Sequence, residues 1–154
     1  MSALDPAQQS TETIYDRLGG DAGLRRLVDV FYSSIFEDPV LQPVFGSPVA
    51  THVDHLTAFL GEVFGGPPRY SRELGGFDAI VAVHRGLHIT EEQRQRFIAL
   101  FTAAFEEVGH GDDRELRDAV LSCIEFGTEV AKVNSNARSE AELHPQREMP
   151  QWHW

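Results

Sequence analysis

Hydrophobic residues recur three and four positions apart in five segments of the chain, which is the spacing that gathers side chains on one face of an α-helix. The pattern predicts helices over about residues 21–37, 51–64, 77–85, 90–108 and 112–133. No segment shows the strict alternation of apolar and polar residues that is typical of a half-buried strand. We therefore expect an all-α fold.

Helix breakers and capping residues mark where these helices begin and end. Two glycines at positions 19–20 precede the first helix, and we expect Asp21 to cap it. The run GGPP at positions 65–68 ends the second helix. Thr90, with Gln93 three residues later, has the spacing of a capping box and predicts the start of the fourth helix.

The short third helix carries a histidine in its apolar stripe. At helical spacing, Phe77, Ile80, Val81, His84 and His88 share one face. A buried neutral imidazole must satisfy two ring nitrogens, and it can do so with a hydrogen bond on one side and a metal on the other. The simpler interpretation is a core histidine bonded to a backbone carbonyl, and this segment alone favours it.

Composition excludes several classes of partner. The chain has 154 residues, enough for one domain with a sizeable core. Its formal net charge of -11 argues against binding to nucleic acid or to an anionic membrane surface, because both need a basic face. No apolar run reaches the length of a membrane span. The single cysteine, Cys123, cannot form a disulfide within the chain, so we expect a cytoplasmic protein.

The ends of the chain lack helical periodicity. We expect a flexible N-terminal arm over residues 1–13, the domain itself over residues 14–134, and a polar C-terminal tail over residues 135–154. The tail ends in two tryptophans, Trp152 and Trp154, and we expect it to pack only weakly on the domain.

Three polar side chains on three predicted helices suggest a pocket. Tyr32, His52 and His84 are surrounded by aromatic residues, and the chain holds ten phenylalanines. An apolar slot with one histidine ligand is what a haem iron requires. A non-haem metal site is the competing interpretation, because His55 follows His52 and His88 follows His84 at helical spacing. A di-iron bundle needs Glu-x-x-His pairs, which are not found here.

Four motifs, in order and spacing, resemble one known family. The stretches IYDRLGG, DVFYSSIFEDPVLQPVF, FLGEVFGGPPRY and VHRGLHIT are similar to those of the truncated haemoglobins, which are short globins with a two-over-two helical sandwich. The resemblance covers roughly residues 14–134, and it is greatest to the second group of that family.

The resemblance implies roles for individual residues. His84 would be the proximal ligand of a haem b iron, Tyr32 the distal tyrosine, and Phe45 an aromatic wedge at the corner before the second helix. His52 would lie on the distal side, as a second hydrogen-bond donor, a gate or a second iron ligand. The second group usually has Trp where this chain has Phe97. The other cofactor contacts would be Phe31, Leu56, Phe59, Tyr70, Leu87 and Phe97.

The function implied by the resemblance is reversible binding of dioxygen, carbon monoxide or nitric oxide. The alternative is a haem enzyme, either a peroxidase or a nitric oxide dioxygenase, with His52 as acid and base. Such an enzyme would depend on a separate reductase, because no flavin or nicotinamide domain fits in this chain. The propionates of the haem would lie near His55, Tyr70, Arg85 and His88. A purely structural helical module remains a third class, and it predicts a colourless protein.

Overall fold

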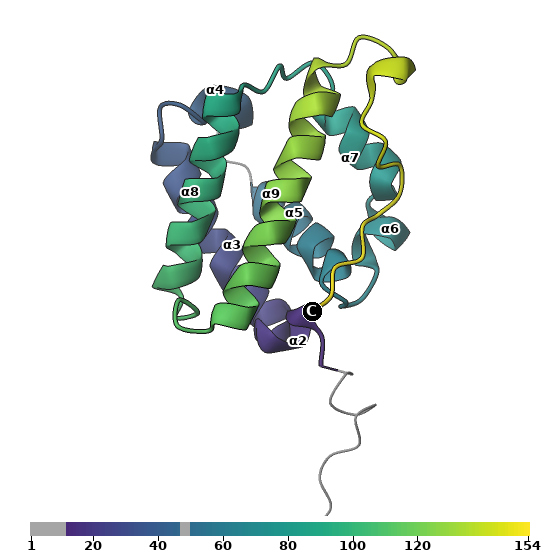
Figure 1. Ribbon diagram of the computed structural model, residues 1–154. Coiled ribbons are helices and arrows are strands. Elements are labelled where there is room, and N and C mark those ends of the chain that lie inside the picture. The colour runs from purple at the N-terminus through teal and green to yellow at the C-terminus, as the bar shows by residue number, and fades with distance from the viewer. Residues whose placement is uncertain (1–11, 47–49) are drawn as a thin grey trace, which may run out of the picture.

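The computed structural model describes residues 12–46 and 50–154 and shows an all-α fold, as expected (Figure 1). No strand occurs within these two ranges. The α-helices are α2 (Ile14–Arg17), α3 (Gly20–Glu37), α4 (Gln42–Phe45), α5 (Ala50–Val63), α6 (Arg69–Glu73), α7 (Gly76–His84), α8 (Glu91–Glu107) and α9 (Arg114–Asn136), and a 3-10 turn, η1 (Glu140–Glu142), follows.

Two pairs of long helices form the body of the molecule. Helix α3 packs against α5 and α8, and α8 packs against α9. In Figure 1 the green helices α8 and α9 stand in front, with α3 and α5 behind them. The shorter helices α6 and α7 complete one side of the body, where α6 contacts α5 and α7 contacts α9. This arrangement agrees with the expected two-over-two sandwich.

Aromatic side chains fill the centre of the body. Phe31, Phe64, Phe101 and Phe105 are all 0% exposed. The Phe31 ring meets Phe101 edge-on at 5.1 Å between ring centroids, so α3 and α8 are joined by an aromatic contact. The apolar stripes predicted from the sequence therefore do face a common core.

The capping box predicted at Thr90 is confirmed. The Thr90 hydroxyl accepts from the Gln93 backbone N–H at 3.1 Å, and the Gln93 side chain accepts from the Thr90 N–H at 3.0 Å. The predicted cap at Asp21 is wrong, because α3 begins one residue earlier, behind Gly19 in a left-handed conformation. The chain turns there so tightly that a Cβ on Gly23 would lie 2.1 Å from the Leu18 carbonyl oxygen.

The corner after α3 is held by one buried carboxylate. Asp38 is 4% exposed, and its Oδ1 accepts from the Val40 N–H at 2.9 Å. Its Oδ2 accepts from Arg96 Nε of α8 at 2.5 Å. Burial alone would raise the pKa of Asp38, but the hydrogen bonds from Arg96 and from two backbone N–H groups outweigh it and lower that pKa. The corner leads into α4, which carries Phe45.

The structure describes the C-terminal end of the chain but only part of the expected N-terminal arm. The expected N-terminal arm falls mostly on residues 1–11, which lie outside the described residues. The C-terminal tail differs from the expectation of weak packing, because Trp152 and Met149 pack against the hydrophobic core. The two terminal tryptophans left open that the tail folds back over the domain or docks on a partner, but without helical periodicity the sequence did not favour this packing. Within the described ranges, no helix is long and apolar enough to cross a membrane.

We predict that Asp38→Asn lowers the free energy of unfolding by about 1.5–3 kcal/mol at neutral pH, because hydrogen bonds to a charged group are lost. Because the pKa of Asp38 is lower in the folded than in the unfolded protein, its carboxylate stabilises the fold above a pH of about 4, the unfolded pKa. This contribution is lost as the pH falls through the pKa of Asp38 in the folded protein. Urea unfolding at several pH values measures both effects. Asp29→Asn, an exposed position on the same helix, is the control. A constant difference between Asp38→Asn and the native protein down to low pH would contradict the explanation.

Candidate functional site

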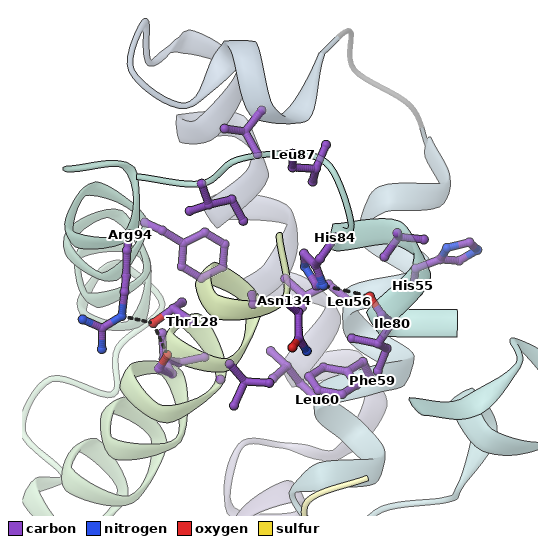
Figure 2. A pocket seen from close by; sticks show the side chains of 18 of the residues that line it. His55, Leu56, Phe59, Leu60, Ile80, His84, Leu87, Arg94, Thr128 and Asn134 are labelled. Atoms are coloured by element: carbon purple, nitrogen blue, oxygen red, sulfur yellow. Dashed lines mark hydrogen bonds between the residues drawn. The ribbon is translucent and has the colours of Figure 1, made fainter. Parts of the chain in front are cut away.

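A mainly apolar cavity of about 550 Å³ lies between the helix pairs and α7. Side chains from α3, α4, α5, α7, α8 and α9 line it. Figure 2 shows His84, Phe59 and Asn134 converging on this space from three different helices. The cavity contains nine of the residues predicted to form the site, namely Tyr32, Phe45, His52, Leu56, Phe59, Tyr70, His84, Leu87 and Phe97.

His84 is the last residue of α7, and one of its ring nitrogens is already bonded. Its Nδ1 lies 2.9 Å from the Ile80 carbonyl oxygen, one helical turn earlier (Figure 2). A carbonyl only accepts, so Nδ1 carries the hydrogen and Nε2 keeps its lone pair. Burial lowers the pKa of His84, and the bond to Ile80 offsets only part of this effect. The imidazole is therefore neutral and ready to bind a metal through Nε2.

The segment that follows His84 is tied to the end of α9 by one residue. Ser135 is 0% exposed, and its carbonyl oxygen accepts from the N–H groups of Gly86 and His88, each at 3.2 Å. Its hydroxyl accepts from the Ile89 N–H at 2.9 Å. Three backbone donors therefore depend on Ser135. Phe77, at 9% exposed, is the one buried residue of α7, so this connection helps to hold the position of His84.

Tyr32 of α3 and His52 of α5 stand next to each other in the cavity wall. Their rings are stacked with centroids 5.7 Å apart, and Phe45 meets Tyr32 edge-on at 5.7 Å. Burial raises the pKa of the Tyr32 hydroxyl, which therefore stays protonated as a donor. His52 Nδ1 is buried and has no hydrogen-bond partner among the described residues. Buried polar atoms are normally hydrogen-bonded, so this unpaired nitrogen is unusual.

Phe31, predicted as a cofactor contact, lies behind the wall of the cavity. Phe31 does not belong to the cavity lining but is 0% exposed in the core. Its ring lies behind Phe97, at 4.7 Å between centroids, and supports that residue from the core side. Of the side chains expected near the propionates, His55 and Tyr70 line the cavity, while the other two, Arg85 and His88, are exposed and outside the lining.

Several polar residues of the lining were not predicted. Arg94 of α8 donates to the Thr128 hydroxyl at 3.1 Å and to the Glu125 carbonyl at 2.8 Å (Figure 2). Asn134 of α9 is 2% exposed and lies in the lining beside His84. Asn134 follows Val130 by four residues, so helical spacing could have placed it on the inner face of α9. No comparable signal identifies Arg94, whose partners are distant in sequence.

The side chains that could bind a metal in the cavity fit haem iron better than a non-haem metal ion. In the part of the chain that the structure describes, no group of three or more His, Cys, Asp and Glu side chains is placed to hold a metal ion. A neutral imidazole whose Nδ1 is hydrogen-bonded, set in a large aromatic cavity, is instead the kind of ligand that haem iron takes.

Comparison with known proteins agrees with this interpretation. The sequence matches the bacterial-like globin family over residues 13–133. Group 2 truncated haemoglobin YjbI of Bacillus subtilis is 32% identical over 108 residues, which cover 70% of this chain and 80% of that protein. A group 1 truncated haemoglobin of Nostoc sp. is 35% identical over 80 residues, which cover 51% of this chain and only 64% of that protein.

Solved structures show the same fold. The group II truncated haemoglobin of Bacillus anthracis superposes with a TM-score of 0.71 at 27% identity, covering 84% of this chain and 97% of that one. The truncated oxygen-avid haemoglobin of Bacillus subtilis superposes with a TM-score of 0.69 at 28% identity, covering 77% of this chain and 97% of that one.

An all-α fold that encloses an apolar cavity, with a buried neutral histidine whose Nε2 keeps its lone pair, is typical of a haem protein of the globin class. The chain belongs to the bacterial-like globin family, and the relatives it matches include truncated haemoglobins of group II. Haem with its iron is accordingly the cofactor that this cavity takes.

We predict that Ser135→Ala exposes the backbone after His84 to faster hydrogen exchange. Without the hydroxyl, the Ile89 N–H loses its acceptor, at a cost of about 1–3 kcal/mol. The exchange rate of that amide should rise roughly tenfold or more if it opens locally. Mass spectrometry or NMR measures the exchange. Ser122→Ala, at an exposed position of the same helix, should leave the rate unchanged, and equal rates in both variants would contradict the role of Ser135.

Proposed function

We propose that the protein reversibly binds dioxygen at the iron of haem b, with His84 as the proximal ligand. One observation carries this proposal. The His84 imidazole donates through Nδ1 to the Ile80 carbonyl and leaves Nε2 free in an apolar cavity that also contains Tyr32 and His52. Bound haem supplies an iron centre that takes up diatomic molecules.

The hydrogen bond to Ile80 has two effects on His84. It fixes the tautomer and the ring orientation, and it makes Nε2 a better electron donor than a free imidazole. Because burial lowers the pKa of His84, protons compete less with the metal for Nε2. Both effects favour stable ligation.

Tyr32 and His52 supply polarity on the α3–α5 side of the cavity. The protonated Tyr32 hydroxyl donates a hydrogen bond to the diatomic ligand, and His52 contributes a second donor or a gate. Phe97 of α8 lines the same space but cannot donate a hydrogen bond. We therefore assign the hydrogen bonds to the ligand to Tyr32 and His52. Dioxygen, which carries partial negative charge on an iron centre, gains more from these donors than carbon monoxide does.

The proposal extends to other ligands and to a protein partner. Carbon monoxide and nitric oxide are small enough to enter the same cavity, and any redox turnover would use a separate reductase as a partner. The relative from Bacillus subtilis that is described as oxygen-avid supports dioxygen as the ligand. The single cysteine, Cys123, is free and buried, which is compatible with the cytoplasmic location we propose.

We predict a strong Soret band in the purified protein that shifts when carbon monoxide binds the ferrous form. His84→Gly should abolish or alter this spectrum, because the iron loses its protein ligand, and added imidazole should restore it. His88→Gly is the matched control, since His88 is exposed and already has a positive φ of 52°. A protein without a Soret band even after addition of haem would overturn the proposed function.

We predict that Tyr32→Phe speeds dioxygen release about tenfold or more, because a donor to a partly charged ligand contributes about 1.5–3 kcal/mol. His52→Leu should speed release as well if His52 donates. Stopped-flow mixing with carbon monoxide measures the release rate. Tyr70→Phe, which removes a different hydroxyl from the cavity wall, is the control. Unchanged release in both Tyr32→Phe and His52→Leu would refute the proposed roles.

A further inference from the structure

The last eighteen residues, 137–154, return along the body of the molecule instead of extending from it. We name this segment the C-terminal strap. In Figure 1 it is the yellow stretch that runs from the end of α9 back to the neighbourhood of α2. The match to the globin family model ends at residue 133, before the strap begins.

The first anchor of the strap is a buried asparagine. The Asn134 side-chain carbonyl accepts from the His144 backbone N–H at 2.9 Å. The His144 ring meets Phe126 of α9 edge-on at 5.9 Å between centroids, and its Nδ1 accepts from the Gln146 N–H at 2.9 Å. These contacts turn the chain back over α9 at the end where Asn134 lies beside His84.

The second anchor lies at the far end of the strap. The Trp152 backbone N–H donates to the carbonyl of Val63, the last residue of α5, at 2.8 Å. Its ring packs on Phe126 at 5.5 Å between centroids. Trp154 follows nearer the surface: it is 44% exposed, lies 4.2 Å from the Arg17 guanidinium and donates from Nε1 to the Glu12 carbonyl at 2.8 Å. Trp152 is therefore the residue that closes the strap on the body.

Between the two anchors, the strap reaches the cavity itself. Gln146 and Pro150 belong to the same lining as His84 and Asn134. On this part of the cavity the strap adds to the wall that α7 forms with Phe77, Ile80, Val83 and His84. Removing the strap would open the cavity to water beside the proximal histidine.

We propose that the C-terminal strap is part of the haem-binding site, where it closes the cavity wall and slows the loss of haem. This inference rests on the proposed function, since it assumes that haem occupies the cavity. The strap excludes water from the bond between His84 and the iron, and its two anchors must stay in place for it to do so. Trp152 and Asn134 act as positioning residues, while Gln146 and Pro150 form the contact surface.

The test compares two tryptophan variants of the full-length holoprotein. Haem transfer to an excess of a haem-scavenging apoglobin measures the rate of haem loss. We expect Trp152→Ala to lose haem roughly tenfold faster or more, because truncation removes the packing of its ring on Phe126 of α9. Trp154→Ala removes an exposed ring together with its contacts to Arg17 and Glu12 but no contact with α9, and it should stay within about twofold of the native rate.

A second pair of measurements separates wall closure from general stability. The double variant Gln146→Ala/Pro150→Ala keeps the anchors at Asn134 and Trp152 but removes side-chain atoms from the cavity wall. It should therefore also accelerate haem loss. Leu116→Ala truncates a residue that is 0% exposed and outside the cavity lining, and it should leave haem loss near the native rate despite lower urea stability. This variant controls for destabilisation alone.

Hydrogen exchange gives a readout that does not use haem loss. The backbone N–H groups of His144 and Trp152 should exchange more slowly in the holoprotein than in the haem-free protein, because the strap closes on the filled cavity. Equal haem loss in the native protein, Trp152→Ala and the double variant would overturn the inference, as would acceleration of the same size in Leu116→Ala. A protein that shows no Soret band would instead refute the proposed function.

Discussion

One hydrogen bond, from His84 Nδ1 to the Ile80 carbonyl, sets the chemistry of the cavity. Inside an apolar wall an imidazole without a partner would be costly, and a charged one more so. The bond satisfies one nitrogen within the helix and leaves the other as a neutral donor of electrons. The rest of the structure serves to keep this imidazole dry, neutral and correctly oriented.

The supports around His84 come from distant parts of the chain. Ser135 of α9 holds the backbone that follows it, and Asp38 ties the corner before α4 to α8, which keeps Phe45 against Tyr32. The strap adds a wall on the same side as Asn134. A short helix with little buried surface of its own can thus carry the ligand, because its neighbours fix its position.

Much of this could be predicted from the sequence, and the rest could not for physical reasons. Helical periodicity predicted the long helices, and the capping box at Thr90 was confirmed. Periodicity placed Phe31 inward, but it does not show whether an inward residue faces a cavity or the core. Ser135 and the strap depend on contacts between residues far apart in sequence, for which local patterns carry no signal.

Resonance Raman spectroscopy of the ferrous protein tests the central claim most directly, because it detects the bond between iron and histidine. The chain has seven histidines, and the account assigns the ligand to one of them. It predicts an iron–histidine stretching band that shifts with ¹⁵N-labelled histidine and disappears only when His84 is replaced. A band that survives replacement of His84, or one that disappears with another histidine, would contradict it.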